Sequence, residues 1–368
     1  MQSISSFNIQ RYPKTENKSL LAGNAADEYL FSYTRNLEGF KGNLTLVNDR
    51  FGFLACHLNE FNPQLVIDCK SQAKSIQSNL QSNNLEVDFK RFISPLDNFL
   101  VKADLVLMKI PKSLNLYNLY LEQISRNADE NTVVICGLMT KYFNVQLLKI
   151  AEEYFTDVSQ SLAHKKSRLL ILKGKKPTVT KPIVLEVKLD EEKSIQQYYG
   201  VFSSNNIDYA TQFLLEKITL QEQDQKVLDL ASGNGIIAFT IQNYYASKNW
   251  QTPELHLVDD SFLAIESSKL NLEGENVHFH NEDNLMHLEA DSFDLIVTNP
   301  PFHFEYEINL EISLSLLEQA HRCLKSGGRL IVVSNRHLNY KSHLVKYFST
   351  VNLVAENSKF VIIEGVKG

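Results

Sequence analysis

The stretch Val227-Leu-Asp-Leu-Ala-Ser-Gly-Asn-Gly235, followed by an apolar segment from Ile236, indicates how the second half of the chain folds. A short apolar run leads into a glycine-containing turn, and a helical pattern begins directly after it. Gly233 and Gly235 allow the backbone to approach a ligand closely. Asp229, at the end of the run, suits a cationic ligand better than the phosphate that a helix N-terminus often binds. The stretch therefore predicts a strand, a binding turn and a helix, although a plain strand-to-helix turn would look similar.

Short apolar runs of this kind alternate with helical patterns along the whole chain. Because the runs are apolar on both sides, they are typical of parallel strands covered by helices. This alternation predicts an α/β protein of doubly wound, Rossmann-like architecture. We expect strands at residues 44–47, 65–67, 105–108, 133–135, 169–172, 227–230, 255–258, 295–298, 330–333 and 360–363.

The two halves of the chain resemble each other. Residues 104–111 match 294–301 at an offset of 190, and residues 66–68 match 257–259 at an offset of 191. Gly52 falls on Gly233 at an offset of 181. The offset is steady within strands and changes between them, as insertions in surface loops would produce. We therefore predict two tandem copies of one domain, at 1–188 and 189–368, with chance similarity among α/β sequences as the alternative.

The junction is predicted at residues 173–194, where prolines and charges replace helical periodicity. Residues 164–181 hold seven cations and no acid, and this run is either a solvated linker or an electrostatic footprint for a phosphate backbone. The cations are Lys165, Lys166, Arg168, Lys173, Lys175, Lys176 and Lys181.

The composition limits the possible functions. The chain has 368 residues, 43% of them hydrophobic and 22% charged, which is typical of a folded globular protein. Its net charge of −6 disfavours a protein that coats nucleic acid non-specifically. The four cysteines form no C-x-x-C pair, so we expect reduced thiols in a cytoplasmic protein. The N-terminal residues have no apolar core of the signal-peptide type, and no apolar stretch reaches roughly 18 residues, so we expect no signal peptide and no membrane partner. We separately expect a monomer.

Acidic residues follow the next two predicted strands. Asp259 ends the strand at 255–258, where a carboxylate commonly binds ribose hydroxyls. Asp260 is the alternative cap of a helix starting near Ser261. Asp283 follows a third strand and is a candidate acceptor for an adenine amine.

The motif Phe293-Asp-Leu-Ile-Val-Thr-Asn-Pro-Pro-Phe302 carries the chemistry. Two prolines directly after a strand make a rigid turn and remove two backbone donors. The Asn299 side chain and the Pro300 carbonyl then offer two acceptors for the protons of an NH₂ group, and Phe302 offers a flat apolar face. We predict Asn299, Pro300, Pro301 and Phe302 as the catalytic residues.

The order of these elements resembles the class I S-adenosylmethionine-dependent methyltransferases, and Asn-Pro-Pro-Phe resembles their amino-methylating branch. The resemblance implies S-adenosylmethionine as cofactor and a direct transfer from sulfur to nitrogen that depends on positioning. The residues it assigns to the cofactor are Asp229, Ala231, Gly233, Gly235, Asp259 and Asp283.

Other segments resemble the bacterial ribosomal RNA guanine-N2 methyltransferases. These are Asn299-Pro-Pro-Phe-His303 and Ser334-Asn-Arg-His-Leu-Asn-Tyr340, and the N-terminal Gln10-Arg-Tyr-Pro13, Ala25–Leu30 and Val47–Gly52 favour the large-subunit branch. The resemblance implies methylation of the exocyclic N2 amine of a guanine in 23S rRNA, at position 1835 in the usual numbering. The alternatives are a small-subunit rRNA guanine, a protein glutamine or an adenine as substrate, and a non-enzymatic rRNA-binding assembly factor.

The chain departs from this family at two sites. Ala231-Ser-Gly-Asn-Gly235 replaces Gly-Cys-Gly-Asn-Gly, and Ser204 replaces an arginine. In the first copy, Asn48 takes the place of Asp229, and Lys109-Ile-Pro111 takes the place of Asn-Pro-Pro. We therefore expect the first copy to be degenerate and to bind RNA, with Lys109 as one contact, or else only to stabilise the second copy.

The remaining candidates are less specific. Phe202, His303, Arg336 and His337 are predicted substrate contacts. His278 and His280 alternate on a strand, but no third ligand is evident, so a polar strand face is favoured and no metal is predicted.

Overall fold

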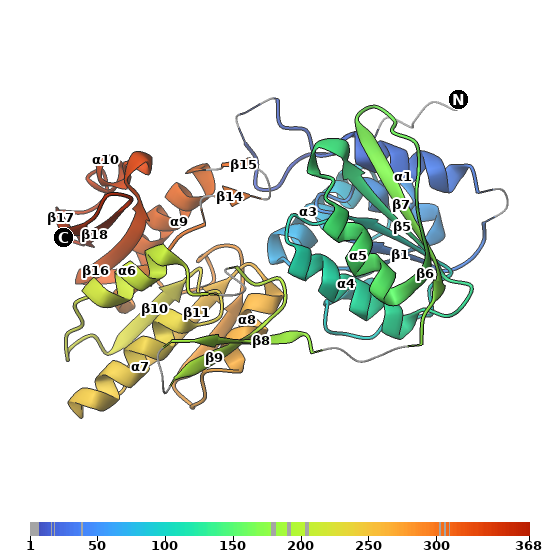
Figure 1. Cartoon of the computed structure of the whole chain (residues 1–368). Helices are drawn as coiled ribbons and strands as arrows, with labels where there is room; N and C mark the ends of the chain where they lie inside the picture. The colour runs from blue at the N-terminus through green and yellow to red at the C-terminus, as the bar shows by residue number, and fades with distance from the viewer. Residues whose placement is uncertain are drawn as a thin grey trace. The chain divides into compact units, whose positions relative to one another are not determined.

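The computed structural model describes residues 7–15, 17, 19–37, 40–177, 182–189, 193–202, 206–301, 303–304, 307–308 and 310–368. Phe302, Lys181, Ser204 and the side chain of His303 lie outside the described residues. The chain divides into two compact units, Met1–Ile183 and Val184–Gly368 (Figure 1). Each unit is built on its own seven-stranded sheet with helices packed on it.

The sheet of the first unit has the strand order β3-β2-β1-β4-β5-β7-β6. Its strands are β1 (Leu44–Val47), β2 (Gln64–Val66), β3 (Phe92–Ile93), β4 (Leu105–Lys109), β5 (Val133–Met139), β6 (Phe155–Gln160) and β7 (Ser167–Lys175). Its helices are α1 (Ala25–Arg35), α2 (Phe53–His57), α3 (Lys70–Ser82), α4 (Leu114–Asn127) and α5 (Val145–Tyr154).

The sheet of the second unit has the order β12-β11-β10-β13-β16-β18-β17. Its strands are β10 (Lys226–Leu230), β11 (Glu254–Asp259), β12 (Val277–Asn281), β13 (Phe293–Thr298), β16 (Leu324–Asn335), β17 (Thr350–Glu356) and β18 (Phe360–Val366). The helices are α6 (Tyr209–Lys217), α7 (Ile236–Lys248), α8 (Phe262–Lys269), α9 (Leu310–Cys323) and α10 (Tyr340–Leu344). Two antiparallel pairs lie outside this sheet, β8 (Val184–Lys188) with β9 (Ser194–Tyr198), and β14 (His303–Phe304) with β15 (Glu307–Ile308).

Both faces of the second sheet are covered, which accounts for its apolar strands. One face packs residues such as Val227 and Leu255 against α6 and α7. The opposite face packs Leu228 and Ile296 against α9 and α10. Successive residues of a strand point to opposite faces, so burial on both faces requires a continuous apolar run. The predicted doubly wound fold is confirmed.

The same strand order in both sheets confirms the duplication, and it also corrects the predicted alignment. In the first sheet Val47 lies between Val66 and Met108. In the second sheet Leu230 lies between Val258 and Thr298. Met108 and Thr298 keep the predicted offset of 190, but Val47 then matches Leu230 at 183 and Val66 matches Val258 at 192.

The corrected offset reassigns the first-copy turn. Gly52 corresponds to Gly235 rather than to Gly233, and both residues cap a helix N-terminus in the left-handed conformation, at φ 80° and 78°. Asn48 corresponds to Ala231 rather than to Asp229, with φ of 60° and 58°. The sequence comparison was wrong here because the two turns share little beyond a glycine.

The two sheets are mixed rather than wholly parallel. β18 runs antiparallel to β16 and β17, as β7 does to β5 and β6. The ten predicted ranges all correspond to observed strands, and β12 is the polar strand expected around His278 and His280. Three further strands of the two sheets are absent from the prediction: β3 has only two residues, and most side chains of β6 and β17 are at least partly exposed.

The division between the units also differs from the predicted one. The predicted boundary at 188 would separate β8 from β9, which pair from Val184 with Tyr198 to Lys188 with Ser194. The observed division after Ile183 keeps this hairpin whole. The four cysteines are free thiols. No helix in the described part of the chain is long and apolar enough to cross a membrane.

Candidate functional site

The carboxyl ends of five parallel strands form one edge of the second sheet. β10 lies beside β11 and β13, which are followed outward by β12 and β16. The connection from β10 leads to one side and that from β13 to the other, so the strand order reverses between them. Ligands of doubly wound proteins bind at such a reversal. The predicted residues between Asp229 and Arg336 that the structure describes lie at or after the ends of these strands.

The glycine turn after β10 contains three left-handed residues, Ala231, Gly233 and Gly235. A Cβ atom added at Gly233 would meet nothing within 4 Å, so this residue faces open space. A Cβ atom at Gly235 would lie 3.0 Å from the Ser268 hydroxyl and 3.1 Å from Leu272. Gly235 therefore allows the start of α7 to pack closely against Ser268 of α8 and against Leu272, whereas the backbone of Gly233 is accessible to a ligand.

Asp229 is buried below this turn, at 1% exposure. Its Oδ2 atom accepts a hydrogen bond from the Ala238 backbone nitrogen in α7, and its Oδ1 atom has no partner in the described part of the chain. Burial raises the pKa of Asp229 well above its usual value, and the charge of Asp259 adds to this effect. A buried carboxylate oxygen without a partner is costly, so it marks a place for a donor or a cation.

Asp259, at the end of β11, closes the turn from the other side. Its Oδ2 atom accepts from the Gly233 nitrogen at 2.9 Å, and its Oδ1 atom accepts from the Ser261 nitrogen at 2.9 Å. Ser261, not Asp260, caps α8, because its hydroxyl accepts from the Ala264 nitrogen. The ribose position predicted for Asp259 thus lies beside the glycine turn.

Asp283 follows β12, and its Oδ1 atom accepts from the side-chain nitrogen of Asn284 at 2.8 Å. It is half-buried. Since β12 is two strands away from β10, Asp283 lies toward the outer part of the same edge.

Asn299 directly follows β13, and two residues of the α6 N-terminus hold its side chain. Its Nδ2 atom donates to Asp208 Oδ2 at 3.1 Å and to Thr211 Oγ1 at 3.0 Å. Asp208 is also the N-cap of α6 and accepts from the Ala210 and Thr211 nitrogens. Sequence reasoning missed this role of Asp208, although a cap before an apolar helix is a recognisable signal.

The two prolines differ in their surroundings. Pro300 is buried and Pro301 is exposed. The Pro301 carbonyl accepts a hydrogen bond from the Ser313 hydroxyl of α9. No side chain in the described part of the chain donates to the Pro300 carbonyl, which is the one predicted to accept from a substrate amine. The predicted stacking of Phe302 and the contact of His303 lie outside the described side chains.

The other predicted substrate contacts are exposed. Phe202, between β9 and α6, is 66% exposed. Arg336 follows β16 and bonds to Glu356 and to the Asn357 carbonyl at the turn between β17 and β18. His337 is exposed beside it.

In the first unit, the structure argues against the predicted RNA contact of Lys109. This residue occupies the position that corresponds to Asn299, and its Nζ atom lies 2.6 Å from Asp27 Oδ1. Both side chains are largely buried. Asp27 belongs to the capping box of α1, so Lys109 is part of an internal ion pair and is not available to a phosphate without breaking it.

The basic run is not a linker, because residues 167–175 form β7. Lys165 pairs with Glu28 at 2.9 Å. The Lys166 carbonyl accepts from both the nitrogen and the hydroxyl of Thr140, which places the β6–β7 turn beside exposed Lys141.

Comparison with known proteins shows the family to which the chain belongs. Residues 2–177 match the family model "RLMG N-terminal domain", and residues 192–364 match "Methyltransferase small domain". The chain is 32% identical to ribosomal RNA large subunit methyltransferase G of Psychromonas ingrahamii, over 98% of this chain and 96% of that protein. It is 31% identical to the protein of the same name from Yersinia enterocolitica, over 98% and 92%.

A solved structure, the 16S rRNA N2 G1207 methyltransferase of T. thermophilus in complex with AdoMet and guanosine, has the same fold. The TM-score is 0.75 at 19% identity, over 94% of this chain and 92% of that one. The similarity to the two curated proteins covers nearly the full length of both partners. The chain therefore belongs to the ribosomal RNA large subunit methyltransferase G family.

Proposed function

We propose that this protein transfers a methyl group from S-adenosylmethionine to the N2 amine of a guanine in 23S rRNA. The observation that carries the proposal is the Asn299 amide, held by Asp208 and Thr211 beside buried Pro300 at the carboxyl edge of the sheet. Full-length similarity to large-subunit methyltransferases supports the choice of RNA. A 23S rRNA substrate also implies that the protein acts in the cytoplasm.

The residues of the glycine turn fit S-adenosylmethionine. The unpartnered Oδ1 atom of Asp229 can accept from the ammonium group of a methionine moiety. The open space at Gly233 leaves room for that moiety, and the carboxylate of Asp259, at the end of β11 beside this residue, is the expected acceptor for ribose hydroxyls. Bound in this way, the cofactor supplies an electrophilic methyl group.

The protein contributes mainly orientation. A carboxylate only accepts hydrogen bonds, so Asp208 forces the Nδ2 atom of Asn299 toward itself and leaves the Oδ1 atom to accept elsewhere. Asn299 Oδ1 and the Pro300 carbonyl would each accept one proton of the guanine N2 amine. This fixes the nitrogen lone pair in line with the methyl group, and the methylated amine then loses a proton to water. The target base must leave its stack to reach this edge.

Mass spectrometry of nucleosides tests this proposal. The purified full-length protein is incubated with S-adenosylmethionine and with unmodified 23S rRNA, 16S rRNA or release factor in separate reactions. We expect N2-methylguanosine in 23S rRNA alone, at position 1835 by primer extension. Methylation of 16S rRNA, of adenine or of the release factor would refute the substrate that we propose.

We further propose that the first unit binds RNA and does not methylate. Lys109, Ile110 and Pro111 stand where the second unit has Asn-Pro-Pro, so the amide acceptor is missing. The Lys166 carbonyl accepts from Thr140, the neighbour of Lys141, beyond the carboxyl end of β5, and the two exposed lysines are the candidates for a phosphate contact. We expect Lys141→Glu/Lys166→Glu to weaken rRNA binding and to lower its salt dependence. Unchanged affinity would leave the first unit with a stabilising role only.

A further inference from the structure

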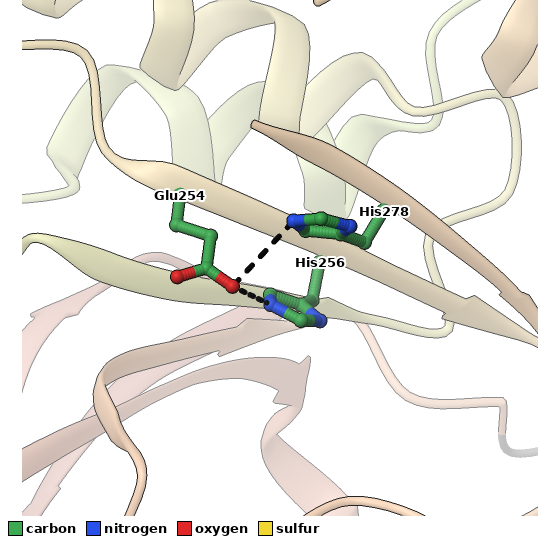
Figure 2. Close-up of side chains that lie close together, drawn as sticks. All are labelled: Glu254, His256 and His278. Carbon is green, nitrogen blue, oxygen red and sulfur yellow. Dashed lines mark hydrogen bonds and ion pairs between the residues drawn. The ribbon is translucent and has the colours of Figure 1, made fainter. Parts of the chain in front are cut away.

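Three side chains that methyl transfer does not use meet near the start of β11 and β12. Glu254 and His256 are the first and third residues of β11, and His278 is the second residue of β12. Because the two strands are parallel with His256 opposite His278, both imidazoles project from the same face of the sheet. Figure 2 shows the Glu254 carboxylate and the two rings turned toward one another.

The distances suit a shared ion. Glu254 Oε1 lies 2.7 Å from His256 Nε2 and 3.5 Å from His278 Nε2, and the three ligand atoms all lie within 4.8 Å of one another. Zn²⁺ binds nitrogen and oxygen at about 2.0–2.1 Å in a tetrahedron, which places its ligand atoms about 3.3 Å apart. Side-chain movements of about 1 Å therefore bring all three atoms to an ion.

A further histidine supports one of these ligands from behind. His256 Nδ1 lies 3.0 Å from His280 Nε2, and the two rings are stacked. Histidines that bind metal through one ring nitrogen usually hold the other in a hydrogen bond, which fixes the ring. His256 is buried, whereas the side chain of His278 is 41% exposed, so the cluster is open to ions from solution on one side.

The first unit shows that the fold itself does not need these ligands. The strand register of the duplication places Gln64 at the position of His256. Gln64 is buried there and donates to the Thr45 hydroxyl and to the Val101 carbonyl. An amide thus satisfies the position of His256 in the first copy, so the strand pairing itself does not require an imidazole there.

We propose that Glu254, His256 and His278 form a binding site for a divalent transition-metal ion, best matched by Zn²⁺ with water as its fourth ligand. The site could not be recognised from the sequence, because Glu254 and His256 lie on β11 whereas His278 lies on β12, and only the pairing of these strands brings the three side chains together. His256 lies three residues before Asp259, about 10 Å along the strand, so the ion is away from the methyl-transfer edge. It would tie the edge strand β12 to β11.

Lys226 is the competing cation. Its Nζ atom lies 3.2 Å from the same Glu254 Oε1 atom, and it also lies 5.4 Å from the centre of the Phe293 ring. Metal binding must displace this ammonium group from Glu254, and Phe293 offers it an alternative position. Removal of the charge at position 226 is therefore expected to strengthen metal binding, whereas removal of His278 must weaken it.

The test is calorimetric titration of the full-length, EDTA-treated protein with ZnCl₂, together with visible spectra of the Co²⁺ form. We expect one Zn²⁺ per chain with a Kd of about 1 μM or tighter. His278→Ala should weaken binding at least about tenfold, His278→Cys should retain it, and Lys226→Met should tighten it. His164→Ala, at an exposed histidine of the first unit, is the matched control and should change nothing.

Thermal unfolding separates loss of the site from loss of the fold. Without metal, all variants should melt near the Tm of the natural chain, and a given Zn²⁺ concentration should raise the Tm of His278→Ala less than that of the other proteins. A Kd in the millimolar range, or equal Zn²⁺ affinity in the natural chain and in His278→Ala, would overturn the proposal. Neither result depends on methyl transfer, so these experiments can refute the metal site without refuting the proposed function.

Discussion

Asn299 donates a hydrogen bond from its side-chain nitrogen to the Asp208 carboxylate, 3.1 Å away, across 91 residues of sequence. Since a carboxylate cannot donate, this bond permits only one orientation of the Asn299 amide. The free oxygen of that amide is the acceptor that the proposed reaction requires. Asp208 is thus a positioning residue, and it acts on the substrate through Asn299.

Substitution of Asp208 tests this relationship. Asp208→Ala should lower kcat about tenfold to a hundredfold, because the amide loses its fixed orientation, and should leave S-adenosylmethionine affinity nearly unchanged. Asp208→Asn should recover part of the loss, since its oxygen can accept from both the α6 backbone and Asn299. Asn299→Ala should abolish most of the transfer with cofactor binding intact. Steady-state kinetics measures kcat of these variants, and titration measures their affinity for S-adenosylmethionine. A large loss of cofactor affinity in either alanine variant would contradict these roles.

Asp229→Asn should weaken S-adenosylmethionine binding by roughly tenfold to a hundredfold. A hydrogen bond to a charged group is worth about 1.5–3 kcal/mol, and the asparagine oxygen can still accept from the Ala238 nitrogen. Because burial raises the pKa of Asp229, cofactor affinity in the natural chain should increase with pH as this carboxyl loses its proton. That increase should be absent in the variant. Calorimetric titration across pH gives both results, and equal affinities would exclude the contact with the ammonium group.

The left-handed turn predicts a set of stability changes. Ala231 has φ 58°, a conformation that costs a residue with a Cβ atom about 1–2 kcal/mol. Ala231→Gly should therefore increase the free energy of unfolding by roughly 1 kcal/mol. Gly233→Ala should decrease it by a similar amount, and Gly235→Ala by more, because its Cβ atom would press on Ser268. Urea denaturation orders the three variants, and an equal effect of the two glycine variants would contradict the packing role of Gly235.

The parts of the fold that could be predicted are those that depend on local pattern. Strands such as Leu44–Val47 are buried on both faces and are therefore apolar throughout. The strand at Thr350–Glu356 could not be recognised, because five of its seven side chains are exposed and the other two are half-buried, so this edge strand has no apolar run and no regular alternation. The offset of the duplication was correct for residues 104–111, wrong by one residue at 66–68, and wrong by two at Gly52, where the two turns are built differently.

In the candidate site, too, the features that depend on local sequence pattern could be predicted and the others could not. Asp229, Gly233, Asp259 and Asn299 could be predicted because each lies at or just after the carboxyl end of a strand, and these strand ends must lie at the shared edge. The partners of these residues could not, since contacts across long sequence separations depend on how helices pack. Lys109 illustrates the difference: its position was correctly matched to Asn299, but its ion pair with Asp27, 82 residues away, has no sequence signal.

The degenerate first copy keeps one feature of the cofactor turn in altered form. Asp49 Oδ2 accepts from the Ala55 nitrogen at 2.7 Å, as Asp229 Oδ2 accepts from Ala238, and the two nitrogens correspond at the offset of 183. The carboxylate therefore occupies the same place although it comes from the turn rather than from the strand. Burial raises the pKa of Asp49 to about 7, and the charge of Asp27 adds to this effect, whereas Lys109 opposes it.

The raised pKa of Asp49 predicts how stability depends on pH. The folded chain binds this proton up to about pH 7 and the unfolded chain only up to about pH 4, so this group makes the folded state less stable as pH rises between these values. Asp49→Asn keeps the acceptor for the Ala55 nitrogen and removes the charge. The variant should match the natural chain near pH 4 and exceed it at pH 8, by an amount of the order of a few kcal/mol, since one pKa unit corresponds to about 1.4 kcal/mol. Chemical denaturation at the two pH values measures the difference, and a gain of the same size at both would show that Asp49 is ionised in the folded protein throughout.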